Sequence, residues 1–151
     1  KITEKTADKL SLEFESETFL AGGPESGFSC PDNMAFDRKG NLWITSDISG
    51  GAMGQEPYTT FKNNGLFFVP MSGKDAGKVL QVASAPVHAE FTGPFFSPDG
   101  KTLFLSVQHP GEYSPSLDEL ASHWPEGGTS IPKPAVVGIT GPALEAITGA
   151  T

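Results

Sequence analysis

Short apolar runs, separated by turn residues, recur along the chain and predict an all-β protein. The runs are rich in β-branched and aromatic residues, which favour strands that pack one face against a core. The sequence also contains 18 Gly and 13 Pro, which supply the intervening turns. The expected strands are residues 10–20, 33–37, 41–47, 65–71, 78–83, 93–96, 102–107 and 135–140.

Helix-forming patterns are scarce by comparison. The best candidate is 116–122, where Ser116 precedes Glu119 by three positions, as in a capping box. A helical turn is also expected near 143–147. Helix therefore contributes little to the expected fold.

An internal repeat gives the expected strands an order. Residues 34–45 read M-A-F-D-R-K-G-N-L-W-I-T, and residues 94–106 read P-F-F-S-P-D-G-K-T-L-F-L-S. Each segment predicts a strand, a tight turn and a second strand. In the two turns, Asp37 and Asp99 can accept hydrogen bonds from the turning backbone, and a nearby glycine can take a positive φ. Each unit is therefore expected to be a β-hairpin.

A further hairpin is expected between the two repeats, over 65–86, with its turn at 72–77. Four strands then precede the point where the pattern restarts, and four antiparallel strands make one blade of a β-propeller. The sequence therefore predicts a partial β-propeller. It should hold about one and a half blades of four-stranded antiparallel sheet, with loop insertions.

Two long segments, 48–64 and 110–134, interrupt the expected blades. The first explains why Gly40 and Gly100, the glycines of the repeated turns, lie farther apart than the ~40–50 residues of common propeller repeats. Binding residues are often placed on loops held by a rigid scaffold. The two insertions are therefore expected either to build a site or to be solvated decoration.

Residues 1–151 are expected to form a single fragment of a β-propeller domain. The chain opens on Lys1 without an initiator methionine and stops at Thr151 in small, polar sequence, which predicts a longer parent protein. An incomplete ring leaves sheet edges open. The expected partner is therefore the remaining N-terminal part of the parent propeller, or a second copy of the chain that associates through these edges.

Charge and cysteine content exclude several classes of function. Acidic residues number 18 against 10 basic ones, so the net charge is −8 and nucleic acid is not an expected partner. No apolar run approaches the ~20 residues of a membrane helix, so no membrane partner is expected. The lone cysteine, Cys30, excludes an intrachain disulfide and a Cys-rich zinc site. Cys30 is expected to be a small buried hydrophobe.

A few oxygen-bearing side chains near strand ends are candidate metal ligands, because hard cations such as calcium bind carboxylate and amide oxygens. Asp32 and Asn33 follow a proline and are expected either to bind a metal or to shape a turn. Glu90 precedes an apolar strand, where a carboxylate is costly to bury unless it is paired or coordinates a metal. Asp47 ends a predicted strand and either joins this site or caps the strand end.

The candidate catalytic residue is His109, in the segment Q-H-P-G-E at 108–112. Its imidazole can ligate a metal, donate a proton to a leaving oxygen, or hydrogen-bond the following loop. The sequence contains no G-x-S-x-G nucleophile elbow, no phosphate-binding P-loop and no zinc-type histidine spacing. The residues by themselves therefore leave the reaction open.

A set of short motifs does point to a family. They are S-C-P-D-N-M-A-F-D at 29–37, G-N-L-W-I at 40–44, E-F-T-G-P at 90–94, F-S-P-D-G-K-T-L-F at 96–104, Q-H-P-G-E at 108–112, S-H-W-P at 122–125 and P-A-V-V at 134–137. Over most of 28–140 the sequence resembles the C-terminal part of the PhoX-like alkaline phosphatases, a group of secreted bacterial β-propeller proteins. The motif S-P-D-G-K-T alone recurs in many propellers, whereas Q-H-P-G-E directly after such a hairpin is much more specific.

The resemblance implies a phosphomonoesterase that holds iron and calcium at one mouth of a propeller. It also implies a phosphate ester substrate and a periplasmic or secreted location. The family's iron-binding cysteine lies in a T-C-E-E motif that this sequence lacks, as it lacks the family's Arg-Pro-Glu segment. The iron role is therefore not assigned to Cys30, and the fragment alone is expected to be inactive.

The alternative is a non-catalytic propeller module that binds or scaffolds an unidentified ligand. A propeller fold by itself implies no reaction. The absence of a complete catalytic constellation in this sequence supports this alternative. A T-C-E-E motif in the N-terminal part of the parent would favour the enzyme.

Overall fold

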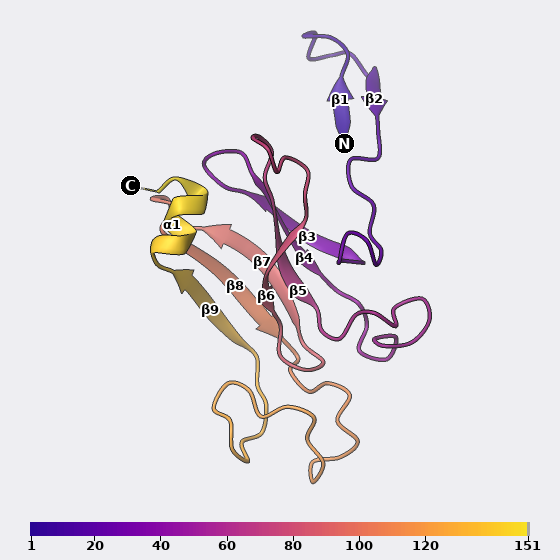
Figure 1. Cartoon of the computed structure of the whole chain (residues 1–151), viewed down its shortest axis with the longest axis vertical. Helices are drawn as coiled ribbons and strands as arrows, with labels where there is room; N and C mark the ends of the chain where they lie inside the picture. The colour runs from indigo at the N-terminus through magenta and orange to yellow at the C-terminus, as the bar shows by residue number, and fades with distance from the viewer. Residues whose placement is uncertain (151) are drawn as a thin grey trace.

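The computed structural model describes residues 1–150 and confirms a partial β-propeller with two open, antiparallel sheets (Figure 1). The first sheet has four strands in the order β3-β4-β5-β6, and the second has three in the order β7-β8-β9. The strand bounds are β3 (Pro31–Phe36), β4 (Leu42–Ser46), β5 (Gly65–Val69), β6 (Leu80–Ser84), β7 (Glu90–Phe96), β8 (Thr102–Gln108) and β9 (Ala135–Thr140).

The expected long strand at 10–20 is wrong. Only Phe14–Ser16 (β2) is a strand, and it pairs with a strand that the apolar pattern did not reveal, Ile2–Glu4 (β1). All six of these residues are exposed, and the small hairpin stands apart from the two sheets (Figure 1). A strand extends only as far as it finds a partner for its backbone groups, and β1 offers three residues.

The expected helix at 116–122 is also wrong. Ser116 and Glu119 form an isolated β-bridge within the long loop 110–134, and the Ser116 hydroxyl accepts a hydrogen bond from the Asp118 N–H at 3.2 Å. The capping residue thus closes a local turn that no helix continues. The turn expected at 143–147 is a short helix, α1 (Pro142–Thr148), which ends at Gly149 with a φ of 72°.

The two sheets pack face to face around Trp43, whose side chain is fully buried. Its ring lies 4.9 Å from the ring of Phe68 in the same sheet and 5.5 Å from the ring of Phe96 in the second sheet. Strand alternation places Leu66 beside it and Leu103, Leu105 and Val107 opposite. These residues form the core between the sheets.

The first sheet also has an apolar outer face, on the side away from the second sheet. Leu42, Ile44, Phe67 and Val69 form this face together with Phe28. A groove of about 470 Å³ runs over it and reaches the exposed Met34 and Phe36 on β3. The corresponding outer face of the second sheet carries Phe95, Phe104 and Val136, all exposed.

Each of the two repeated hairpin turns forms around its aspartate. The Asp37 carboxylate accepts hydrogen bonds from the backbone N–H groups of Lys39 and Asn41, both at 2.9 Å. It also accepts from the Asn41 amide at 3.0 Å and from the indole N–H of Trp43 at 3.1 Å. The exposed Asp99 accepts from the Ser97 hydroxyl at 2.6 Å and from the Lys101 N–H at 3.0 Å. Asp37 therefore joins the turn to the core, whereas Asp99 serves only its turn.

The loops 48–64 and 110–134 lie at the opposite end of the sheets from these short turns (Figure 1). Neither contains a helix or a named strand. Within residues 1–150, no helix has the length and apolar character needed to span a bilayer.

We predict that Asp37→Ala destabilises the chain far more than Asp99→Ala does. Loss of the buried Asp37 carboxylate leaves several donors without an acceptor, at a cost on the order of 3 kcal/mol in the free energy of unfolding. At the exposed Asp99, water can accept the hydrogen bonds that the carboxylate would no longer accept. Urea unfolding followed by tryptophan fluorescence measures both variants. Equal losses of stability would contradict the special role of Asp37.

Candidate functional site

The predicted site residues gather at the end of the sheets that carries the long loops. Pro31 pairs with Ser46, and Glu90 pairs with Gln108. Asp32 at the start of β3 and Asp47 just after β4 therefore lie at the same end as Glu90 at the start of β7. His109, just after β8, lies there too. β7 contacts both β3 and β4, so the two sheets bring these side chains together.

Glu90 is the buried carboxylate of this group, with an exposure of only 7%. Its Oε2 is buried and has no hydrogen-bond partner among residues 1–150. Burial raises the pKa of Glu90, and the negative charge of Asp47 raises it further, while His109 lowers it and Asp32 raises it. Glu90 is thus a carboxylate in an environment that disfavours its charge.

His109 lies between two carboxylates. Its Nε2 is 3.4 Å from Oε1 of Glu90, and its Nδ1 is 3.4 Å from Oε2 of Glu112. Nδ1 is also 3.3 Å from the backbone carbonyl of His88. One ring nitrogen thus faces the Glu90 carboxylate, and the other faces the His88 carbonyl and the Glu112 carboxylate. His109 is therefore paired with the carboxylate expected to form the site.

Backbone strain is concentrated at the same end. Within residues 1–150, the non-glycine residues with positive φ are Cys30 at 48°, His88 at 58° and His109 at 36°. Cys30 and His88 lie shortly before the strands that carry Asp32 and Glu90, and His109 is itself a candidate residue. Such conformations cost of order 1–3 kcal/mol and persist only where the surroundings enforce them. The sequence offers no signal for this strain, because the three residues share no turn motif.

Asn33 has a structural partner that its sequence position did not indicate. Its Oδ1 accepts hydrogen bonds from the Thr92 hydroxyl and, at 2.7 Å, from the Gly93 N–H. The bulge in β3 between Pro31 and Met34 turns Asn33 toward β7. Asn33 therefore joins the first sheet to the second by hydrogen bonds. Its assignment as a metal ligand stays a prediction. Asp32 and Asp47 are both exposed, as metal ligands or as solvated charges would be.

Sequence reasoning missed Asn64, which ends the loop 48–64. Its Oδ1 accepts from the Ile48 N–H at 2.7 Å and from the Ser46 hydroxyl at 3.3 Å. Its Nδ2 donates to the carbonyls of Ile48 at 3.1 Å and Ala89 at 3.2 Å. Asn64 is buried, and these bonds fix the residue directly before Glu90. In the sequence, the only indication of this role was a single asparagine directly before a predicted strand.

Cys30 is half-buried, not fully buried as expected. Its Sγ donates to the Tyr58 hydroxyl at 3.6 Å, and its backbone carbonyl accepts from the Asp47 N–H at 2.9 Å. These contacts give Cys30 a role in holding the loop 48–64 and the residue Asp47. They agree with leaving it out of the candidate metal ligands.

The donor set at this end suits a hard, oxygen-preferring cation such as calcium. Glu90 contributes a buried oxygen without a partner, and Asp47 and Asp32 contribute negative charge around it. Among residues 1–150, however, no three His, Cys, Asp or Glu side chains come close enough together to hold a metal ion. The described residues therefore do not form a metal-binding cluster by themselves.

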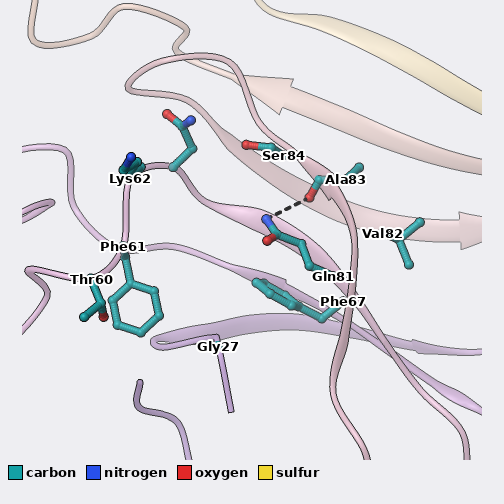
Figure 2. Close-up of a pocket in the computed structure, with 10 residues that line it drawn as sticks. Gly27, Thr60, Phe61, Lys62, Phe67, Gln81, Val82, Ala83 and Ser84 are labelled. Atoms are coloured by element: carbon teal, nitrogen blue, oxygen red, sulfur yellow. Dashed lines mark hydrogen bonds between the residues drawn. The ribbon is translucent and has the colours of Figure 1, made fainter. Parts of the chain in front are cut away.

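A separate hollow of about 550 Å³ lies between the loop 48–64 and the outer strand β6 (Figure 2). Phe61 and Phe67 line it together with Gln81, whose amide donates to the Ala83 carbonyl at 3.5 Å. The residues that line it include no carboxylate and no histidine. This hollow therefore does not include the contact between Glu90 and His109.

We predict that Glu90→Gln stabilises the metal-free chain at neutral pH. Because folding raises the pKa of Glu90 above its ordinary value of 4.5, ionisation of this residue opposes folding. The protonated Glu90 side chain contributes stability that is fully present below pH 4.5 and is lost as the pH rises through the folded-state pKa. The variant should therefore unfold at a higher urea concentration than the wild type at neutral pH, and the two should converge in acid.

The matched control is Glu112→Gln, which removes the exposed carboxylate beside the same histidine. It should change stability little, since exposed ion pairs contribute about 0–1 kcal/mol. Urea unfolding in a chelator-containing buffer across the pH range measures all three proteins. A Glu90→Gln variant less stable than the wild type at neutral pH would show that the carboxylate is favourably paired.

Comparisons with known proteins agree with the motifs. The family model of alkaline phosphatase PhoX matches residues 1–111. Among solved structures, the chain is similar to Pseudomonas fluorescens PhoX in complex with vanadate, a transition state analogue, with 33% sequence identity and a TM-score of 0.57. This match covers 73% of this chain and 17% of that chain. A comparison with curated protein sequences gives no significant match. The family match and the structural match together show that this chain belongs to the PhoX alkaline phosphatase family.

Proposed function

We propose that this chain forms part of a metal-dependent phosphatase that hydrolyses phosphate monoesters. The observation that carries the proposal is the pairing of the buried Glu90 with His109 at the loop-bearing end of a PhoX-family chain. Vanadate bound to the related Pseudomonas protein is named as a transition state analogue, which supports phosphoryl chemistry in this family. The proposed substrate class is therefore an organic phosphate monoester.

In this proposal Glu90 and Asp32 would supply oxygen ligands to calcium, and Asp47 would add negative charge beside them. A bound cation would neutralise charge on the phosphoryl oxygens and orient the ester. His109 would be the proton donor to the leaving oxygen, since it lies beside the proposed ligand Glu90, with its Nε2 3.4 Å from Oε1 of that residue. This chain is not proposed to bind iron by itself. Any iron ligands would come from residues outside it.

We also propose that the remaining ligands come from other parts of a longer protein. The chain spans 17% of the Pseudomonas PhoX chain it matches, and its own residues provide no three-ligand cluster within 1–150. The isolated chain is accordingly proposed to lack turnover. A periplasmic or secreted location is proposed with the family assignment, and it suits calcium as a cofactor.

A second candidate is a non-catalytic binding or scaffold module. The observation that favours it is the absence of a three-ligand group among residues 1–150. Under this alternative, the strained residues at the loop-bearing end would serve folding or ligand binding without any reaction. Metal binding and turnover separate the two candidates.

We predict that calcium binds the chain through Glu90 and Asp32. Isothermal titration calorimetry of the wild type should show binding that falls at least 10-fold in Asp32→Ala and in Glu90→Ala, the loss typical when a metal site is disturbed. Asp99→Ala, an exposed aspartate at the opposite end of the sheets, is the control and should bind as the wild type does. In the full-length protein, p-nitrophenyl phosphate turnover should fall with the same variants. Full metal content and full turnover in the combined Asp32→Ala, Asn33→Ala, Glu90→Ala protein would show that the site lies elsewhere.

We further predict that the isolated chain self-associates through its open edges and apolar outer faces. Phe104 is 41% exposed and Val136 is 71% exposed, a pattern typical of a face that packs on a neighbouring layer. Light scattering should show mass rising with concentration, and Phe104→Thr should reduce this rise. Phe14→Ser, at a 58% exposed phenylalanine of the separate β1–β2 hairpin, should not. A wild type that stays monomeric at all concentrations would contradict the prediction.

A further inference from the structure

The two long insertions meet at one aromatic side chain. Tyr113, in the loop 110–134, lies over Gly50 and Gly51 in the loop 48–64. Its hydroxyl is 3.2 Å from the hydroxyl of Ser49. The loops are also joined to the segment before β7, since the Gly111 N–H donates to the Val87 carbonyl at 2.9 Å. Tyr113 therefore links both insertions to the entrance of the strand that carries Glu90.

Gly50 leaves room for the tyrosine ring. A Cβ at this position would lie 2.6 Å from Cε2 of Tyr113, closer than real Cβ contacts come. A Cβ at Gly51 would lie 3.4 Å from Cε1, at an ordinary contact distance. Adjacent glycines thus differ in one respect: only Gly50 must lack a side chain for Tyr113 to stay in place.

Tyr113 packs in turn on His88. The two rings meet edge to face, with centroids 5.7 Å apart and planes at 86°. The buried Nδ1 of His88 has no hydrogen-bond partner among residues 1–150, so no polar contact of that atom holds the ring. His88 nonetheless keeps a φ of 58°. His88 lies in a turn that is closed by the hydrogen bond from the Ala89 N–H to the Pro86 carbonyl at 3.0 Å, and the Tyr113 ring packs on this turn from outside.

We propose that Tyr113 is a positioning residue for the candidate site. Its ring lies over Gly50 and packs on the His88 imidazole, and it thereby supports the turn whose His88 carbonyl orients the imidazole of His109 toward Glu90. The distances that carry this are 3.3 Å from the His88 carbonyl to Nδ1 of His109 and 3.4 Å from Nε2 to Oε1 of Glu90. The inference rests on the proposed function only for its consequence on calcium binding. The arrangement itself is a property of this chain.

The test follows the histidine side chains by nuclear magnetic resonance at one fixed pH, in the whole chain without metal. The sequence holds three histidines, so each imidazole can be resolved, and His123 serves as an internal reference because its Nδ1 lies 2.9 Å from the Ser130 carbonyl in the loop 110–134. Gly50→Ala and Tyr113→Ala should shift the imidazole resonances of His88 and His109 and abolish the cross-peak between the rings of Tyr113 and His88. The His123 resonances should not move.

Two further variants separate positioning from general loss of structure. Gly51→Ala makes the same change one residue away and should leave the His88 and His109 resonances as in the wild type. Tyr113→Phe loses only the contact with Ser49 and should also keep them. Tyr113 is 45% exposed, so its ring can swing into solvent without disturbing the core between the sheets, and the backbone amide spectrum verifies this.

Calcium titration of the same variants connects the arrangement to the proposed function. Gly50→Ala and Tyr113→Ala should weaken calcium binding roughly 10-fold, the loss typical of removing a supporting contact from a metal site. If the imidazole resonances shift in these variants but the wild type binds no calcium, the positioning role is upheld and the proposed function is contradicted. Unshifted histidines in Gly50→Ala and Tyr113→Ala would overturn the positioning role, whatever the calcium result.

Discussion

The burial of Trp43 between the two sheets is the interaction on which the rest of the structure depends. A tryptophan can be buried at this depth only if its indole N–H finds an acceptor, and the Asp37 carboxylate supplies it from the neighbouring turn. The same carboxylate holds the backbone of that turn. The hairpin and the interface between the sheets are therefore stabilised by one buried group.

The interface in turn decides where the candidate site lies. It sets β7 against β3 and β4, which brings Glu90 close to Asp47 and Asp32 and leaves one Glu90 oxygen without a partner. Asn33 and Asn64 reinforce this arrangement, one by pinning β3 to β7 and the other by binding the carbonyl before Glu90. Polar groups inside the fold thus place a carboxylate where its charge is disfavoured.

The sequence predicted those parts of the fold that depend on local chemistry. The repeated hairpins were correct because Asp37 and Asp99 act on their own turns, within a few residues. The strand at 10–20 and the helix at 116–122 were wrong, because strand pairing and helix continuation depend on partners distant in sequence. The gathering of Asp32, Asp47, Glu90 and His109 followed from their common position at strand ends.

Contacts between loops had no comparable signal in the sequence. The contacts of Asn64 and Tyr113 depend on how the insertions pack against each other and against the segment before β7, and insertions follow no period. Among residues 1–150, the non-glycine residues with positive φ and the buried side-chain polar atoms without a hydrogen-bond partner lie at the end that carries Glu90. At the opposite end, aspartate carboxylates accept the hydrogen bonds of the turn backbone. The costs of strained and unpaired groups persist only where the surrounding structure enforces them. Under the proposed function, cation binding at that end would compensate the buried charge of Glu90.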